Sequence, residues 1–210
     1  MDLEPIRRSL RENLDAKYEA REHALTLCRK AIRLSANSIR ATHRSESQEG
    51  DRLLAEVRLL LNEAAAVMVR HPDVRHAGFF HDASKEYAEA KLTHAMVFGH
   101  DLPTPEQLGV EAPAYLNGLA EAVGEMRRHT LDLMRRGELG KSEDLLQVMD
   151  EIYYLLITMD YPDAMTGGLR RSTDVARSII ERTRGDLSTT LIQQHLMSAL
   201  QEAKPDPAQP

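Results

Sequence analysis

Apolar residues recur every three or four positions along most of the chain, a spacing that places them on one face of an α-helix. The clearest case predicts a core-facing stripe that consists of Leu53, Leu54, Val57, Leu60, Leu61 and Val67. No stretch sustains the alternation of apolar and polar residues that marks a half-buried strand. The pattern therefore predicts an all-α protein.

Glycine, proline and capping residues divide this periodicity into six long helices. They are expected at residues 5–47, 51–70, 77–98, 114–136, 142–160 and 169–203. Gly50 marks the first break, and Asp51 and Ser142 are candidate N-caps of the second and fifth helices. Because the connections between these helices are short, we expect an antiparallel bundle in a single domain at residues 1–203. A disordered tail is expected at residues 204–210.

Composition narrows the class of protein. Aromatic residues make up 4% of the chain and tryptophan is absent, so aliphatic residues, alanine and methionine must fill the core. The single Cys28 excludes a disulfide within the chain, fits a reducing compartment and is expected to be a buried core residue. The charged N-terminus lacks an apolar signal core, and no apolar run approaches the roughly 18 residues that span a bilayer. We therefore expect a cytoplasmic protein without a membrane partner.

A basic face runs along the first predicted helix. The net charge is −6, so nucleic-acid binding would need such a local patch. Arg29, Arg33, Arg40 and Arg44 fall within about 60° of one another on a helical projection, and His43 flanks them. Arginine suits phosphate because its planar guanidinium donates two hydrogen bonds at once. The same pattern also fits a solvated face whose arginines pair with acids on a neighbouring helix, and no base-reading motif accompanies it.

The last predicted helix carries a second group of arginines. Three of them alternate with two acids at helical spacing, which favours a salt-bridge ladder within the helix. The ladder consists of Arg170, Asp174, Arg177, Glu181 and Arg184. Arg171 lies outside this ladder and is the freer candidate for a phosphate contact.

Two pairs of glutamates carry the candidate chemistry. Glu86 and Glu89 are three residues apart and Glu121 and Glu125 are four apart, so each pair shares one helical face. If the two helices pack antiparallel, four carboxylates converge with no local base between them. They would repel one another without a cation, and oxygen-only ligands suit Mg²⁺ or Mn²⁺. Each pair also fits ordinary surface acids, and Gly124 beside the second pair is a candidate for close helix approach.

Other cofactor sites find no support in the sequence. A Glu-x-x-His pair of the di-iron type, CxxC, HExxH, a P-loop and GxGxxG are all absent. The acidic quartet is therefore the site to which the remaining hypotheses refer.

Four stretches resemble the translin/TRAX family. The run AREHALTLCRKAIRLSANSIRATHRSE from Ala20 resembles the first helix of archaeal translin-like proteins, and EYAEA from Glu86 resembles the EYVEA segment of TRAX. The run YLNGLAEAVGEMRR from Tyr115 resembles the family's Tyr-Leu-x-Gly segment, and LRRSTDVARSIIERTRGDL from Leu169 resembles its C-terminal basic helix. Together these stretches cover most of the chain in the family's order.

The resemblance implies a seven-helix subunit, with an additional short helix in the loop at residues 103–113. It also implies a hollow octamer that binds RNA or single-stranded DNA on its inner wall. TRAX-type subunits are Mg²⁺-dependent endoribonucleases, whereas translin subunits bind without cleaving. Glu86, Glu89 and Glu125 fall on TRAX-type catalytic acids, and Glu121 falls where TRAX has an aspartate. The complete set of four acids favours the catalytic type, in a homo-oligomer if the organism has one such gene.

The leading hypothesis is a Mg²⁺-dependent endoribonuclease that acts on single-stranded RNA. The four glutamates would hold one or two metal ions, and Arg33, Arg40, Arg44 and Arg171 would hold the RNA backbone. One alternative is a binding protein without catalysis. Another is an all-helical nucleotide pyrophosphohydrolase of the MazG/dUTPase type, although its second acidic pair typically has a spacing of three. A purely structural helical oligomer is the last alternative.

Overall fold

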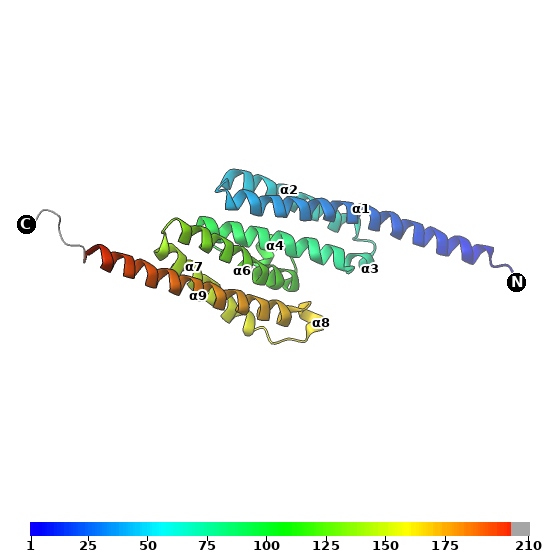
Figure 1. The fold of residues 1–210 in the computed structure, drawn as a ribbon. Coiled ribbons are helices and arrows are strands. Elements are labelled where there is room, and N and C mark those ends of the chain that lie inside the picture. The colour runs from blue at the N-terminus through cyan, green and yellow to red at the C-terminus, as the bar shows by residue number, and fades with distance from the viewer. Residues whose placement is uncertain (203–210) are drawn as a thin grey trace, which may run out of the picture.

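The computed structural model describes residues 1–202, which form six long and three single-turn helices and contain no strand (Figure 1). The long helices are α1 (Glu4–His43), α2 (Ser47–Val67), α4 (Gly78–Phe98), α6 (Ala112–Arg135), α7 (Leu139–Ile157) and α9 (Leu169–Glu202). The single-turn helices are α3 (Pro72–Arg75), α5 (Pro105–Leu108) and α8 (Asp163–Thr166). The predicted all-α class is confirmed, and the predicted tail at 204–210 lies outside the described residues.

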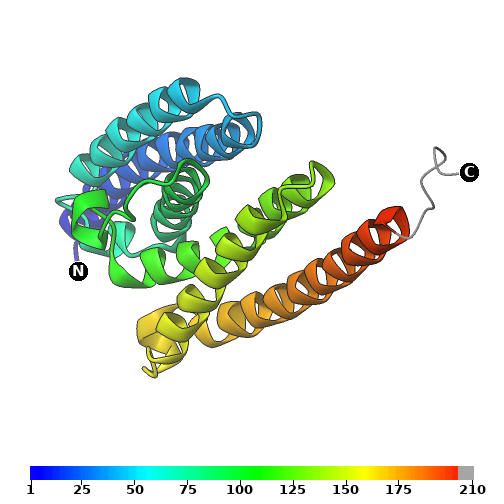
Figure 2. The same cartoon turned by 90° about the vertical axis from the view of Figure 1, so that its left-hand side faces the viewer.

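The long helices stack in three successive pairs. The hairpin of α1 and α2 packs against α4, α4 packs against α6, and α6 packs against α7 and α9. Figures 1 and 2 show this order, from the blue and cyan hairpin through the green helices to the yellow and red pair. The central helices α4 and α6 therefore have neighbours on two sides, and side chains between them are partly shielded from solvent.

The first helix break differs from the prediction. The chain turns at Arg44–Glu46, where Ser45 has a φ of 61°, so α2 begins before Asp51, which is not an N-cap. Gly50 is instead buried inside α2, where an added Cβ would lie 2.9 Å from Cδ2 of His94. This glycine allows the close packing of α2 on α4, a role that local sequence does not distinguish from a helix break.

Two later boundaries illustrate local capping. The expected short helix in the 103–113 loop is α5, and Thr104 caps it through a capping box with Gln107. The fifth long helix, α7, begins at Leu139 rather than at Ser142. Ser142 is buried within its first turns, where its hydroxyl donates to the carbonyl of Glu138 at 3.0 Å. It is therefore not the cap that the sequence suggested.

Most of the expected core residues are buried. Five of the six residues in the α2 stripe belong to the core, Val67 is half-buried, and the adjacent Met68 is fully buried. Cys28 is 1% exposed, and burial raises the pKa of its thiol to about 11. It is thus a packing residue, as expected. No helix within residues 1–202 is both long and apolar enough to cross a membrane.

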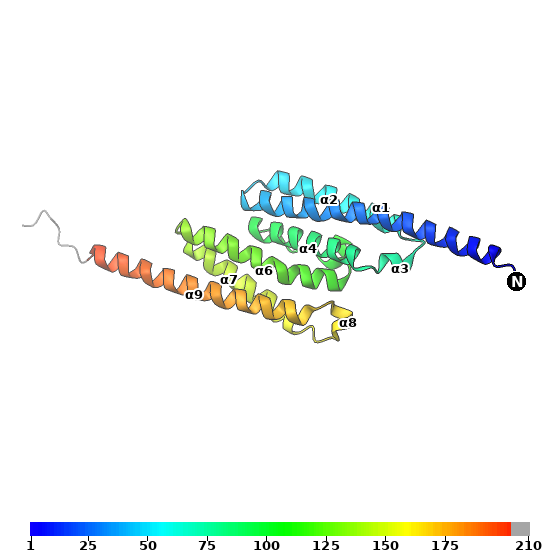
Figure 3. The same cartoon turned by 45° about the vertical axis from the view of Figure 1, so that its right-hand side comes forward.

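Both ends of the described chain extend beyond the bundle. The N-terminal part of α1 and the C-terminal part of α9 project from opposite ends of the helical stack (Figures 1 and 3). Each projecting segment leaves large apolar side chains exposed, among them Leu10 on α1 and Leu196 on α9.

Candidate metal centre

A close contact between α4 and α6 brings the predicted acids together. Gly118 on α6 faces the backbone of α4, where an added Cβ would lie 2.7 Å from the carbonyl oxygen of Lys85 and 2.9 Å from the nitrogen of Glu89. No side chain fits in that space, so glycine sets the helix separation. The expected role of Gly124 in close approach is not observed, because its nearest neighbour is Cδ1 of Ile179 at 3.8 Å.

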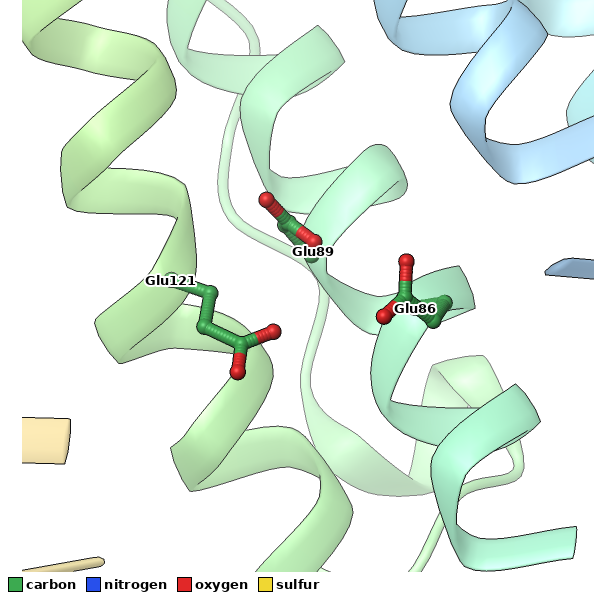
Figure 4. Close-up of side chains that lie close together, drawn as sticks. All are labelled: Glu86, Glu89 and Glu121. Atoms are coloured by element: carbon green, nitrogen blue, oxygen red, sulfur yellow. The ribbon is translucent and has the colours of Figure 1, made fainter. Parts of the chain in front are cut away.

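Three of the four predicted carboxylates converge. Glu86 and Glu89 project from α4 and Glu121 from α6, toward the space between the two helices (Figure 4). One carboxylate oxygen from each of the three lies within 4.8 Å of the others. All three side chains are partly buried. We call these residues the carboxylate trio.

The trio includes a basic neighbour that the sequence analysis did not anticipate. Nζ of Lys85 lies 2.7 Å from Oε1 of Glu121 and 3.6 Å from Oε1 of Glu86. The expectation that no local base lies among the acids is therefore wrong. Burial lowers the pKa of Lys85, but its hydrogen bond to Glu121 and the nearby acids outweigh that effect and leave the pKa raised. The lysine is thus a cation that partly balances the trio.

The fourth predicted acid, Glu125, has a different partner. Nε2 of His43 donates to Oε2 of Glu125 at 2.5 Å, and the imidazole is only 4% exposed. The structure thus buries the His43 side chain against Glu125 of α6 and does not place it on the surface with the arginines. Its other ring nitrogen, Nδ1, is buried without a hydrogen-bond partner among the described residues.

The electrostatics of the acids reflect these partners. Burial, followed by the charges of Glu86, Glu121 and Glu125, raises the pKa of Glu89 to about 8. Burial likewise raises the pKa of Glu86, although Lys85 opposes the effect. The hydrogen bond from His43 lowers the pKa of Glu125. In the absence of a cation the raised pKa keeps Glu89 largely protonated near neutral pH, whereas Glu125 stays ionised.

Arg171 lies beside the carboxylate trio. It lines a surface groove together with Glu89, Glu121, Gly168 and Val175. The groove also contains the glycine turn that precedes α9, with a φ of 86° at Gly168. The sequence placed Arg171 outside the salt-bridge ladder expected on α9 and made it a candidate for a phosphate contact. That ladder is largely absent, because the strongest contact of Arg184 is to Asp150 on α7 at 2.7 Å.

The predicted arginines of α1 are exposed and have different partners. Arg44 forms two hydrogen bonds to Glu46, at 2.8 Å and 2.6 Å, and Arg40 contacts Asn37. Within residues 1–202, Arg29 and Arg33 form no ion pair with an acid. Helical geometry places the four arginines about 40° to 100° around α1 from His43. The basic face therefore adjoins the side of α1 that meets Glu125.

Sequence reasoning missed two residues of this site. Lys85 directly precedes Glu86, so its position in the sequence indicated that it could lie near the acids. The acid that its side chain contacts, however, depends on the packing of the partner helix. Gly118 offered a weaker signal, because a glycine inside a predicted helix is costly unless packing requires it. Both roles follow from the pairing of α4 with α6.

The stacked helical hairpins and the acid-lined site define an all-helical protein with a candidate divalent-metal centre. No family model matches the chain. An uncharacterised protein of Methanocaldococcus jannaschii is 29% identical over 178 residues, which cover 82% of this chain and 77% of that protein. The crystal structure of AfC3PO is 31% identical with a TM-score of 0.81 and covers 89% of this chain and 97% of that one.

Two further solved structures share the fold. AfC3PO in complex with duplex RNA is 31% identical, with a TM-score of 0.79, and covers 92% of this chain and 98% of that one. Apo-NeC3PO is 20% identical, with a TM-score of 0.79, covers 87% and 96%, and supports the fold alone. The chain belongs to the translin/TRAX-like family.

Proposed function

We propose that this protein is a nucleic-acid-binding, Mg²⁺-dependent endoribonuclease that acts on single-stranded RNA. The observation that carries the proposal is the carboxylate trio, in which oxygens from α4 and α6 lie within 4.8 Å of one another. Three such oxygens on rigid helices suit a hard divalent cation. The pKa of about 8 at Glu89 supports the same assignment, since a cation would replace the proton that Glu89 otherwise holds.

RNA binding has separate support. The AfC3PO structure that is 31% identical to this chain was solved with duplex RNA. Here the basic face of α1 adjoins His43, which contacts Glu125, and Arg171 lines the groove of the trio. Arg33, Arg40, Arg44 and Arg171 would bind phosphates along the strand by charge and bidentate hydrogen bonds. No base-specific contact is required, so recognition would depend on the backbone.

The residues divide the chemistry between them. Glu86, Glu89 and Glu121 would hold Mg²⁺ or Mn²⁺, which when bound would activate water and neutralise charge on the phosphate. Glu125, kept ionised by the hydrogen bond from His43, would lie next to the metal ligands and act as a proton acceptor. Lys85 adds a positive charge next to Glu121, and Arg171 would orient the strand at the mouth of the groove.

A non-catalytic binding protein is the second candidate, and two contacts favour it. Lys85 already occupies part of the acidic site, and Glu125 bonds to His43 instead of pointing into the trio. Both contacts resemble a structural charge network more than an open metal site. This candidate predicts retention of RNA without Mg²⁺-dependent products.

One experiment separates the two. Labelled single-stranded RNA is incubated with the protein in Mg²⁺ and, in parallel, in EDTA, and binding and cleavage are measured in the same samples. We expect cleavage only in Mg²⁺, and we expect Glu89→Gln to abolish cleavage while leaving binding unchanged. The matched control is Glu143→Gln, an exposed acid on α7. Cleavage by Glu89→Gln at the wild-type rate would refute the site, and release of pyrophosphate from dNTPs would indicate the pyrophosphohydrolase class.

We also propose that the protein forms a homo-oligomer, and the family resemblance makes an octamer the expected assembly. The projecting part of α1 carries an apolar stripe that consists of Leu3, Ile6, Leu10, Leu14 and Tyr18, and each of these side chains is more than half exposed. The projecting part of α9 carries a second stripe, which consists of Ile192, Leu196, Met197 and Leu200. Such stripes are costly in water and suit burial against a second copy. Light scattering should give a mass well above 23.7 kDa that Leu10→Asp lowers.

A further inference from the structure

A cavity of about 320 Å³ lies apart from the carboxylate trio. Its walls come from α2, the segment from α3 to the start of α4, the α5 loop and the α8 turn. Its volume is at the lower end of the range for small-ligand pockets, roughly 300–1,000 Å³. The proposed cleavage reaction makes no use of it.

The cavity combines an aromatic wall with positive charge. Leu61, Phe80 and Leu108 supply apolar surface, and the guanidinium carbon of Arg75 lies 5.9 Å from the centroid of the Phe80 ring. This cation–π contact holds Arg75 at the cavity without neutralising it. Arg58 on α2 also lines the cavity, and its charge opposes the effect of burial, which raises the pKa of Tyr87.

The charge balance of the lining favours an anion. Among the described residues the lining contains Arg58, Arg75, His76 and His81, and its one acid is the exposed Glu111. Neither arginine forms an ion pair with an acid in the part of the chain that the structure describes, unlike Arg44 or Arg184. The first turn of α4 also lines the cavity, and its N-cap Ala77 supplies no side-chain hydrogen bond. An anion would therefore meet unpaired guanidinium groups and an uncapped helix start.

The cavity and the groove of the trio have one lining residue in common. This residue is Gly167. A Cβ added at Gly167 would lie 3.5 Å from Nε2 of His81, so the glycine turn packs against that imidazole. A strand that ended in the cavity would cross the glycine turn before α9. It would then reach Arg171, Glu89 and Glu121 in the groove.

We infer that this cavity binds the phosphomonoester end of an RNA strand, with the terminal base near Phe80 and the phosphate between Arg58 and Arg75. The inference rests on the proposed function, because it assumes that RNA occupies the adjoining groove. A terminal phosphate carries more negative charge than an internal diester, so two unpaired arginines distinguish strand ends from strand interiors. A free mononucleotide offers the same base and phosphate, and the experiment separates the two sources.

The test compares one RNA sequence in three forms: with a 5′-phosphate, with a 3′-phosphate, and with hydroxyl groups at both ends. Binding is measured by fluorescence anisotropy in EDTA. We expect one phosphorylated form to bind about tenfold more tightly than the hydroxyl form, the ratio that about 1.4 kcal/mol produces. Arg75→Ala and Arg58→Ala should each reduce this ratio toward one. The control Arg52→Ala, which alters an exposed arginine paired with Glu49, should keep it.

Two further measurements make the outcome decisive. A nucleoside monophosphate that binds wild type as tightly as phosphorylated RNA does would identify the free nucleotide as the ligand and overturn the strand-end assignment. Equal binding of all three RNAs, or a preference that persists in both arginine variants, would overturn the inference. Cleavage of the hydroxyl form in Mg²⁺ is measured alongside, so the nuclease proposal stands or fails independently of the end preference.

Discussion

The contact at Gly118 provides the sharpest test of how the site is built. In Gly118→Ala the new methyl group would lie 2.7 Å from the Lys85 carbonyl oxygen and 2.9 Å from Cβ of Ala88. Both neighbours belong to the α4 backbone or to a short side chain, so neither can move without separating α4 from α6. Overpacking of this kind costs about 1–3 kcal/mol, and alanine recovers about 1 kcal/mol of helix propensity.

The matched control is Gly124→Ala, one and a half turns further along α6. Its nearest neighbour would be 3.8 Å away, an ordinary contact, so only the propensity gain of about 1 kcal/mol applies. If the Gly118 clash lies at the upper end of its range, the free energies of unfolding of the two variants differ by about 3 kcal/mol. For a chain of this length that corresponds to roughly 6–12 °C in Tm.

Thermal unfolding followed by circular dichroism, at one protomer concentration, measures the difference. Gly118→Ala should unfold below wild type and Gly124→Ala at or above it. A second measurement, Mg²⁺ binding by calorimetry, should show weaker binding in Gly118→Ala, because separation of the helices spreads the carboxylate trio. Equal or higher stability of Gly118→Ala relative to Gly124→Ala would show that the helix separation is not set by this residue.

Four further outcomes are expected. The folded-state pKa of Glu89, about 8, exceeds its unfolded value, so without metal the protein should lose stability as pH rises from about 4.5 to 8; urea titrations should show a smaller loss in Glu89→Gln. His43→Ala should cost about 1–3 kcal/mol, because the partly buried Glu125 loses its donor, and chemical denaturation measures this cost. Cys28, with a pKa of about 11, should react with a thiol reagent in urea but not in the native state. Arg33→Ala should lower RNA affinity and reduce the salt dependence of binding by about one phosphate contact, as measured by titration at several salt concentrations.

Local sequence predicted the helices better than their ends. Hydrophobic periodicity located all six long helices, because burial of one face determines it. The break before α2 was misplaced because Gly50 resembles a turn residue, whereas the structure uses it to admit His94. Ser142 was misassigned as a cap for a related reason: its side chain bonds within α7 and its burial depends on tertiary packing.

The acidic site was predictable in part. Spacing alone placed Glu86 and Glu89 on one face, and the structure confirms that they meet Glu121 across the helix contact. Spacing could not show that Glu125, one turn further along α6, would pair with α1. That outcome depends on how α1 packs on the neighbouring helices, which brings Nε2 of His43 within 2.5 Å of Oε2 of Glu125. Lys85 was missed for the same reason, since its contact with Glu121 also spans two helices.

The distribution of partners among the four acids explains how the site remains folded without a cation. Two side chains from outside the quartet, Lys85 and His43, each donate a hydrogen bond to one acid of α6. Among the described residues, neither acid of α4 receives a hydrogen bond as short as these two. Burial instead raises the pKa of both Glu86 and Glu89. On α4 a proton on Glu89 therefore takes the place of a counterion, while on α6 the hydrogen bonds from Lys85 and His43 stabilise the acids. A divalent cation that bound here would displace the proton of Glu89, so its affinity should increase with pH across the range in which Glu89 titrates.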